Sequence, residues 1–199
     1  MQQRSRATIA AVLDAAHGLF GTAGFAGVSI DDVAVACGKT KGAIYHHFAT
    51  KEALFEEVFR IEQRRIADVV TTAATSTDTA TALGEALTAY IDEIATNPRA
   101  ARITLLDAPT VMGFERWRRC DDGPFRTMLH DTLAAIARSG RLDASDVPLE
   151  AVTDTILGAV TENALVIATS PDPEALREPR ARACVALVRG LLHAGGGRR

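Results

Sequence analysis

Residues 39–54 read KTKGAIYHHFATKEAL, and this stretch decides the fold prediction. A helix can span only about residues 40–47, because Gly38 is a typical helix stop and Thr50 is a typical N-cap of the next helix. Gly42 costs about 1 kcal/mol of helix propensity relative to alanine. A short helix with this cost and few apolar side chains indicates a surface element that approaches a partner closely.

The segments around this stretch predict a compact helical head. Apolar residues repeat at three- and four-residue spacing through residues 9–20, and Ser29 followed by Asp32 indicates the start of a short second helix. A long helix follows from Thr50 to about Val70. Two short helices joined by a glycine turn, the second one polar and aromatic, predict a helix-turn-helix rather than a plain three-helix packing unit.

The polar side chains of this head match the chemistry of a DNA duplex. Thr40 and Tyr45 can donate to phosphate oxygens, and Lys41 and His46 can reach base edges in the major groove. Lys51 opposes the helix dipole in the first turn of its helix, and a phosphate at that terminus would resolve the conflict. Ser29 could hold a second phosphate in the same way. The predicted DNA-contacting residues are Ser29, Lys39, Thr40, Lys41, Gly42, Tyr45, His46 and Lys51.

The stretch SIDDVAVACGKTKGAIYHHFATKEAL, residues 29–54, resembles the signature of the TetR family of one-component bacterial transcription regulators. The resemblance covers about residues 9–54, including the pair Gly24-Phe25. Cys37 and Lys39 depart from the family pattern, which usually has alanine and a small apolar residue there. The resemblance implies an N-terminal DNA-binding domain and a C-terminal region that binds a small effector and forms a homodimer.

The rest of the chain shows helical periodicity and no strand pattern. The predicted helices are 83–94, 98–106, 114–120, 125–136, 149–168 and 180–193, with a polar connector at 71–81 and a break at 122–124. The predicted fold is all-α. A three-helix helix-turn-helix domain, residues 1–50, is joined by the helix 51–70 to a ligand-binding and dimerisation bundle that completes residues 51–199.

A group of aromatic, methionine and apolar side chains in the bundle predicts an effector pocket, although any one of these residues taken singly is better explained as plain core. Asn163 falls within the apolar face of the 149–168 helix and, with His130, is a candidate polar contact. The Gly123-Pro124 break would supply a flexible wall. The predicted ligand-binding residues are Tyr90, Ile94, Met112, Phe114, Trp117, Phe125, Met128, Leu129, Val160 and Asn163.

The opposite side of the 149–168 helix carries small side chains, which allow a second helix to approach closely. With the last helix, this strip would form a two-plus-two bundle across a molecular dyad. The predicted dimer residues are Ala151, Thr155, Gly158, Glu162, Leu165, Cys184, Leu187, Val188 and Leu191.

Composition and motifs limit which other classes of protein the chain can belong to. The formal net charge of −3 requires any DNA-binding surface to be local. The three cysteines lack metal-ligand spacing, and no apolar run approaches the roughly 18 residues of a membrane span. No motif for phosphate binding, metal binding or nucleophilic catalysis is present. We therefore expect a cytoplasmic protein that is not an enzyme and needs no metal or cofactor.

Together these features predict a homodimeric transcriptional regulator, with a repressor as the leading form. Its expected partners are a palindromic DNA operator, a second copy of the chain and a small, largely apolar effector that releases the operator. The alternatives are a ligand-independent regulator and a redox-responsive one, in which Cys120, beside Arg118 and Arg119, would be the trigger. An architectural DNA binder would need a basic body, which this chain lacks.

Overall fold

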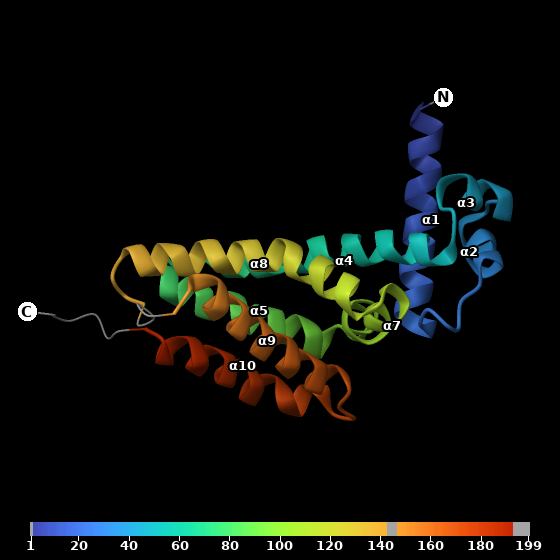
Figure 1. The fold of residues 1–199 in the computed structure, drawn as a ribbon. Coiled ribbons are helices and arrows are strands. Elements are labelled where there is room, and N and C mark those ends of the chain that lie inside the picture. The colour runs from blue at the N-terminus through green and yellow to red at the C-terminus, as the bar shows by residue number, and fades with distance from the viewer. Residues whose placement is uncertain (1, 143–146, 193–199) are drawn as a thin grey trace, which may run out of the picture. The chain divides into compact units, whose positions relative to one another are not determined.

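The computed structural model describes residues 2–142 and 147–192, without the side chains of residues 2–4 and 120–123 (Figure 1). Within these ranges the regular secondary structure is helical, and an isolated bridge pairs Leu142 with Leu192. The predicted all-α fold is confirmed. The chain divides into two compact units, the first made of residues Met1–Gln63 and Pro98–Cys120, the second of Arg64–Asn97 and Asp121–Arg199.

The first unit contains the predicted head and a set of short helices from the middle of the chain. Its elements are α1 (Gln2–Ala23), α2 (Ile30–Cys37), α3 (Lys41–His47), the first part of α4 (Lys51–Ala73), α6 (Pro98–Ala101), the π-helix η1 (Arg102–Asp107), α7 (Ala108–Met112) and the start of α8 (Phe114–Arg138).

Local hydrogen bonds set the ends of the head's short helices where the sequence predicts them. The hydroxyl of Ser29 accepts the N–H of Asp32, whose carboxylate accepts the N–H of Ser29, and together they form a capping box. Gly38 ends α2 in the left-handed conformation, with φ of 63°. The hydroxyl oxygens of Thr40 and Thr50 accept backbone N–H groups and so cap α3 and α4.

An aromatic cluster holds the head together. The rings of Phe20, Phe25 and Phe55 lie within 5.8 Å of one another, centroid to centroid. Ile44 of α3 is fully buried beneath the same head. Full burial of such side chains contributes about 1.5–3 kcal/mol each, so this core fixes the position of the short α3 helix.

The segment 98–120 packs on α1. The carboxylate of Asp107 accepts the backbone N–H of Phe25 at 2.7 Å. Gly24, with φ of +75°, lies beside Arg102 and Asp107, and a side chain there would be strained. Gly21 lies so close to Arg99 that a Cβ would come within 2.9 Å of the arginine side chain. These contacts tie the loop before α2 to η1.

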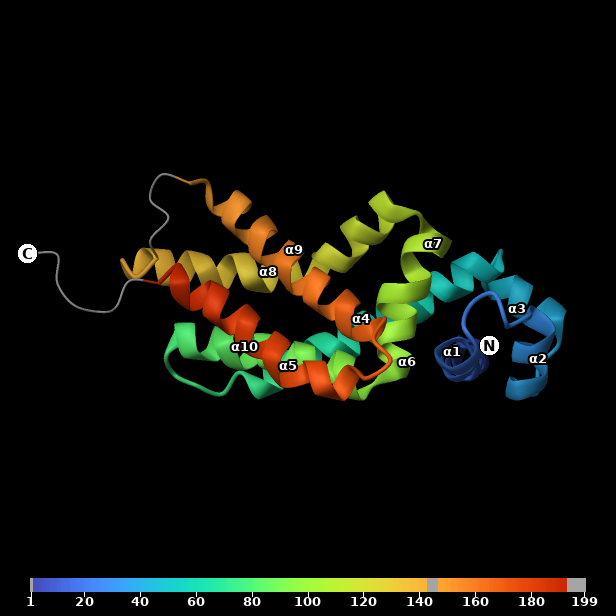
Figure 2. The same ribbon diagram turned by 90° about the horizontal axis from the view of Figure 1, so that it is seen from below.

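The second unit is a helical bundle of α5 (Thr79–Thr96), α9 (Leu149–Ala168), α10 (Pro173–Gly190) and the parts of α4 and α8 that follow Gln63 and Cys120. Helix α10 packs along α5, and α9 packs against both, as Figure 2 shows. The fully buried Ile91 of α5, Leu133 of α8 and Ile156 of α9 form part of its core.

Three predicted boundaries are wrong. Helix α8 runs without a break through residues 122–124, with Pro124 exposed inside it. An internal proline removes one helical hydrogen bond, and buried Trp117 and Leu129 on either side anchor the helix despite this loss. The connector after α4 is only residues 74–78, because Asp78 caps α5. The last helix begins earlier than predicted, at Pro173, a favoured first-turn residue after the cap Asp172.

Helix α9 has the length and apolar composition of a membrane span, which the sequence analysis did not expect. Among the described residues it is the helix whose length and composition would suffice to cross a membrane, a test that core helices of soluble proteins also pass. Only 33% of its most apolar window is buried within the chain. A large part of this apolar helix therefore has no covering within a single copy.

Candidate functional site

The exposed side of α3 carries the residues predicted to read DNA. Lys41, Gly42, Tyr45 and His46 are exposed, whereas Ile44 points into the core. A side chain at Gly42 would meet nothing within 4 Å inside the chain. The protein's own packing therefore does not explain this glycine, which is consistent with close approach to an external surface.

Lys41 already has an electrostatic partner on α2. Its ammonium lies 2.8 Å from the Asp31 carboxylate, and this hydrogen bond raises the pKa of Lys41. Both side chains are more than half exposed. The sequence reading missed Asp31, although an acidic residue in the first turn of α2 is visible in the sequence.

The argument for Lys51 as a phosphate contact is wrong. Its ammonium donates to the backbone carbonyls of Phe25 and Val28 at 2.9 and 3.0 Å and lies 3.9 Å from the centre of the Phe25 ring. These carbonyl and ring contacts offset the unfavourable helix dipole without an external anion. Lys51 therefore joins α4 to the loop before α2.

The phosphate role predicted for Ser29 also conflicts with the structure. The Asp32 carboxylate accepts both the N–H and the hydroxyl of Ser29, at 2.8 and 2.6 Å. These hydrogen bonds lower the pKa of Asp32, which keeps a negative charge at the start of α2. The Ser29 hydroxyl is therefore already engaged within the protein, beside a negative charge.

Lys39 and Thr40 are exposed just before α3. The Thr40 hydroxyl accepts the N–H of Ala43 as a cap, and its O–H can donate to a second group at the same time. Together with Lys41, Gly42, Tyr45 and His46, these residues make up the candidate DNA-reading surface.

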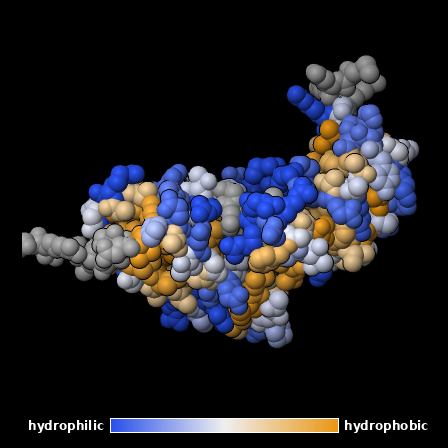
Figure 3. All heavy atoms as spheres, viewed as in Figure 1, coloured by the Kyte–Doolittle hydropathy of each residue, from blue (hydrophilic) through white to orange (hydrophobic). Residues whose placement is uncertain are grey.

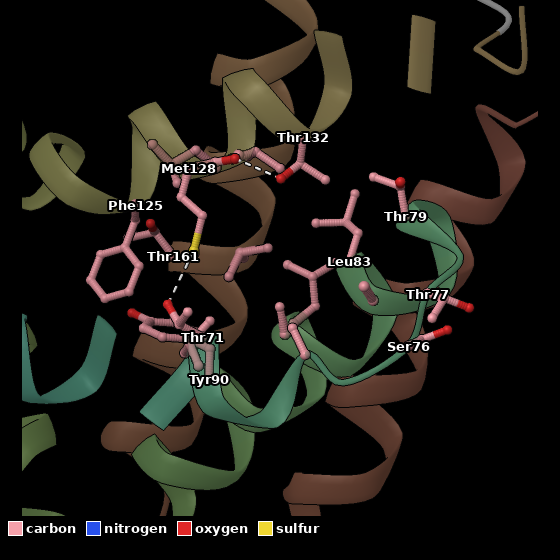
Figure 4. A pocket seen from close by; sticks show the side chains of 18 residues that line it. Thr71, Ser76, Thr77, Thr79, Leu83, Tyr90, Phe125, Met128, Thr132 and Thr161 are labelled. Carbon is pink, nitrogen blue, oxygen red and sulfur yellow. Dashed lines mark hydrogen bonds between the residues drawn. The ribbon is translucent and has the colours of Figure 1, made fainter. Parts of the chain in front are cut away.

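The second unit contains a cavity of about 330 Å³, within the range of small-molecule sites (Figure 4). Its walls come from the end of α4, the connector 74–78, α5, α8 and α9. The rings of Tyr90 and Phe125 meet edge to face at 5.7 Å. Five predicted ligand-binding residues line this cavity, namely Tyr90, Phe125, Met128, Leu129 and Val160.

The other predicted ligand residues lie elsewhere, which corrects the sequence reading. Met112, Phe114 and Trp117 belong to the first unit, where the indole N–H of Trp117 donates to the Thr104 carbonyl at 2.8 Å. Ile94 is buried in the core and does not line the cavity.

Asn163 does not line the cavity either. Its amide donates to the Ala159 carbonyl and accepts from Arg180 of α10 at 3.2 Å. Asn163 therefore joins α9 to α10. His130 is also absent from the cavity wall and lies 3.6 Å from the Asp131 carboxylate.

The sequence reading treated the segment 71–81 as a plain connector and missed its side chains in the cavity. Hydroxyl groups from this segment and from α8 and α9 form much of the polar lining, namely those of Thr71, Ser76, Thr77, Thr79, Thr132 and Thr161. The sequence pattern that could have predicted this lining is a run rich in threonine and serine beside apolar helices.

The predicted dimer residues divide into two groups. On α9, Ala151, Thr155 and Glu162 are exposed, and Gly158 and Leu165 are half-buried. On α10, Leu187 is exposed and Leu191, its C-cap, is half-buried. Figure 3 shows apolar atoms among polar ones on the lower side of this unit, where Figure 1 places α9 and α10.

Cys184 and Val188 cannot belong to an exposed face, and their assignment to the dimer interface is wrong. Each is only 2% exposed, because this side of α10 packs within the bundle. Burial raises the pKa of the Cys184 thiol, which makes it a poor nucleophile. The side chain of Cys120, the predicted redox trigger, lies outside the described residues.

The first unit, with its capped α2, glycine turn and exposed α3, defines a helix-turn-helix protein. Comparison with known families supports this assignment to the helix-turn-helix proteins. The family of bacterial regulatory proteins named tetR matches residues 12–58, and the tetracyclin repressor-like C-terminal domain matches residues 80–191, more than half of the chain. The chain belongs to the TetR family of transcription regulators, which confirms the resemblance seen in its sequence.

Two curated relatives match a part of the chain. The regulator AcrR of Shigella flexneri is 35% identical over 68 residues, 34% of this chain and 32% of AcrR. The repressor AcnR of Corynebacterium glutamicum is 39% identical over 59 residues, 30% of this chain and 31% of AcnR. The matches thus span about a third of these curated relatives.

Solved structures match nearly the whole chain. A TetR-family regulator from Pectobacterium atrosepticum superposes with a TM-score of 0.80 at 26% identity, over 96% of this chain and 97% of its own. The regulator FadR of Bacillus subtilis, crystallised with stearoyl-CoA, gives 0.75 at 15% identity, over 92% and 98%. The second match supports the fold alone.

Proposed function

We propose that the chain is a homodimeric, sequence-specific DNA-binding regulator of the cytoplasm, a repressor that leaves its operator when a small, largely apolar effector binds. The family is one of regulators and not of enzymes. The observation that carries the proposal is the coexistence of an exposed, polar α3 in one unit with a largely apolar cavity in the other. Each of these features has a distinct partner.

The DNA contacts are assigned to α3 and the residues just before it. Tyr45 and Thr40 donate to phosphates, and Lys41 and His46 reach base edges in the major groove. Two copies of α3 in a dimer would enter successive major grooves on one face of a palindrome, with centres about 34–36 Å apart or somewhat more. We assign DNA binding to residues 1–50, and effector binding and dimerisation to residues 51–199.

The dimer interface is assigned to the exposed sides of α9 and α10. Helix α9 is apolar, yet a single copy buries only 33% of its most apolar window. A side chain at Gly158 would meet nothing within 4 Å inside the chain, so an approaching helix has room there. A second copy that places its own α9 and α10 on this surface would bury it.

The cavity is assigned to the effector. Helix α4 begins beside the head at Lys51 and contributes Val70 and Thr71 to the cavity wall, so one helix connects the two sites. An effector releases DNA only if it binds better to a subunit arrangement whose two α3 helices no longer fit the operator. The stearoyl-CoA seen in the FadR structure does not carry over, because no described cavity residue offers a cation for its phosphates.

One experiment tests the proposal as a whole. The preferred duplex is selected from a random DNA pool, and its affinity for the protein is measured alone and with a panel of apolar metabolites. We expect a palindromic site and at least one compound that both raises the melting temperature and weakens DNA binding. A non-palindromic site would count against the dimer, and compounds that bind without changing DNA affinity would count against the effector role.

A further inference from the structure

We infer that the cavity of the second unit takes an elongated, uncharged molecule with an apolar body and neutral hydrogen-bonding groups. This inference deepens the proposed function and rests on the assignment of the cavity as the effector site. It concerns the chemical class of the ligand and follows from the cavity's side chains.

The side chains that line the cavity determine which charges a bound ligand can carry. None of the described residues that line it is an acid, a lysine, an arginine or a histidine. A carboxylate, phosphate or ammonium group that entered would lose its hydration without gaining a counter-charge. The site therefore selects against ligands that place an ionised group among these side chains.

Three charged residues around the connector 74–78 are committed to other contacts. Glu85 accepts the backbone N–H groups of Thr75 and Ser76 at 2.9 Å each. Asp78 caps α5 and forms an ion pair with Arg141. All three of these charged side chains line a separate surface groove on the α10 side of α5. They shape the connector and leave the cavity neutral.

The polar groups that do face the cavity are hydroxyls. In Figure 4, Ser76, Thr77 and Thr79 lie on one side and Thr71, Tyr90 and Thr161 lie on the other, with Leu83 between them. A hydroxyl can donate and accept, so it suits an alcohol, ketone, ester or amide. The two sides favour a ligand with neutral polar groups at one or both ends.

The cavity's dimensions limit the ligand further. The wall formed by α5 extends from Thr79 to Tyr90, about 16 Å at 1.5 Å per residue. The volume of about 330 Å³ lies at the small end of the range for small-molecule sites. An extended molecule of about eight to ten heavy atoms is shorter than this wall and can lie along it.

A matched series of probes tests whether the cavity disfavours charged ligands. 1-Octanol, octanamide, octanoate, octylammonium and octanoyl-coenzyme A share one apolar chain and differ in charge. We expect 1-octanol and octanamide to raise the melting temperature of the full chain, and each charged probe to need at least tenfold higher concentration for the same shift. A charged probe as effective as its neutral counterparts would overturn the inference, as would a failure of both neutral probes.

Two variants and one control variant test whether the probes bind in this cavity. Ala86→Phe fills it and should abolish the shift by 1-octanol, and persistence of the shift would overturn the assignment. Thr161→Lys introduces a cation and should improve octanoate binding at least tenfold, whereas Thr96→Lys, on exposed α5 surface outside the cavity, should not. Equal octanoate binding by both lysine variants would contradict the charge argument.

The DNA assay separates this inference from the proposed function. If the neutral probes bind in the expected order and the selected duplex is then released, both stand. If they bind in that order and DNA affinity does not change, the ligand class stands and the role as effector site fails.

Discussion

The ammonium of Lys41 on α3 lies 2.8 Å from the carboxylate of Asp31 on α2. The side chain assigned to base recognition is thus paired within the protein before DNA arrives. Any DNA contact by Lys41 must compete with this pair, which reduces its attraction to phosphates of arbitrary sequence.

Replacing Asp31 by asparagine should therefore release Lys41. We expect Asp31→Asn to tighten binding to random-sequence duplex by up to about tenfold and to steepen the salt dependence by about one counterion, with a smaller gain on the selected operator. Titrations at several salt concentrations measure both effects. Asp68→Asn makes the same change of charge on α4 and serves as the control. Weaker binding of Asp31→Asn to all duplexes would mean that Asp31 holds Lys41 in its productive position.

Lys51 should matter more for stability than for DNA affinity. Lys51→Met removes two charged hydrogen bonds to the Phe25 and Val28 carbonyls, and we expect a loss of about 1.5–3 kcal/mol in the free energy of unfolding. Chemical denaturation measures this loss, and Lys39→Met, at an exposed position, provides the control. An unchanged stability combined with a salt dependence lower by one counterion would restore the phosphate contact.

Gly158 offers a sharp test of the dimer interface. Because a side chain there meets nothing within the chain, Gly158→Leu should fold normally as a single copy. We expect it to prevent or distort dimerisation, so that sedimentation shows monomer and operator affinity falls. Gly18→Leu, at a similarly open helical glycine on α1, should remain a dimer. A normal dimer of Gly158→Leu would place the interface elsewhere.

Tyr45 should contribute to DNA affinity without sequence preference. Its side chain is 44% exposed on α3, and its phenolic O–H is assigned to a phosphate. We expect Tyr45→Phe to weaken binding to the selected operator and to random duplex by the same factor, about 3- to 10-fold for one hydrogen bond. A change confined to the operator would assign Tyr45 to base recognition instead.

Asp78 should make the second unit sensitive to acid. Hydrogen bonds from Arg141 and Thr81 lower its pKa to about 2, from an ordinary value of 3.8. Between these values the unfolded chain binds the proton more readily, so this contribution to stability is complete above about pH 4 and is lost as the pH falls towards 2. Asp78→Asn should have a lower melting temperature at pH 6, and the difference should shrink by pH 2. A difference independent of pH would contradict this role.

The sequence determined the head and the fold class, because the signals there are local. Ser29, Gly38 and Thr50 begin or end helices through hydrogen bonds and backbone angles within a few residues, and the structure places each where its chemistry predicts. The sequence also grouped Tyr90, Phe125 and Met128, which line the cavity. It added Met112, Phe114 and Trp117 to the same group, and these lie in the first unit.

Tertiary structure decided which groups meet across the chain. Helical periodicity places Asn163 on an apolar face, but only the position of α10 shows that Arg180 donates a hydrogen bond to its amide oxygen. Lys51 suggests an unpaired charge until folding brings the Phe25 and Val28 carbonyls to its ammonium. The hydroxyls of the 74–78 connector and its flanks line the cavity, where Glu85 accepts two backbone N–H groups of the connector and Asp78 caps α5. Such pairings depend on packing between distant segments, which local sequence patterns do not specify.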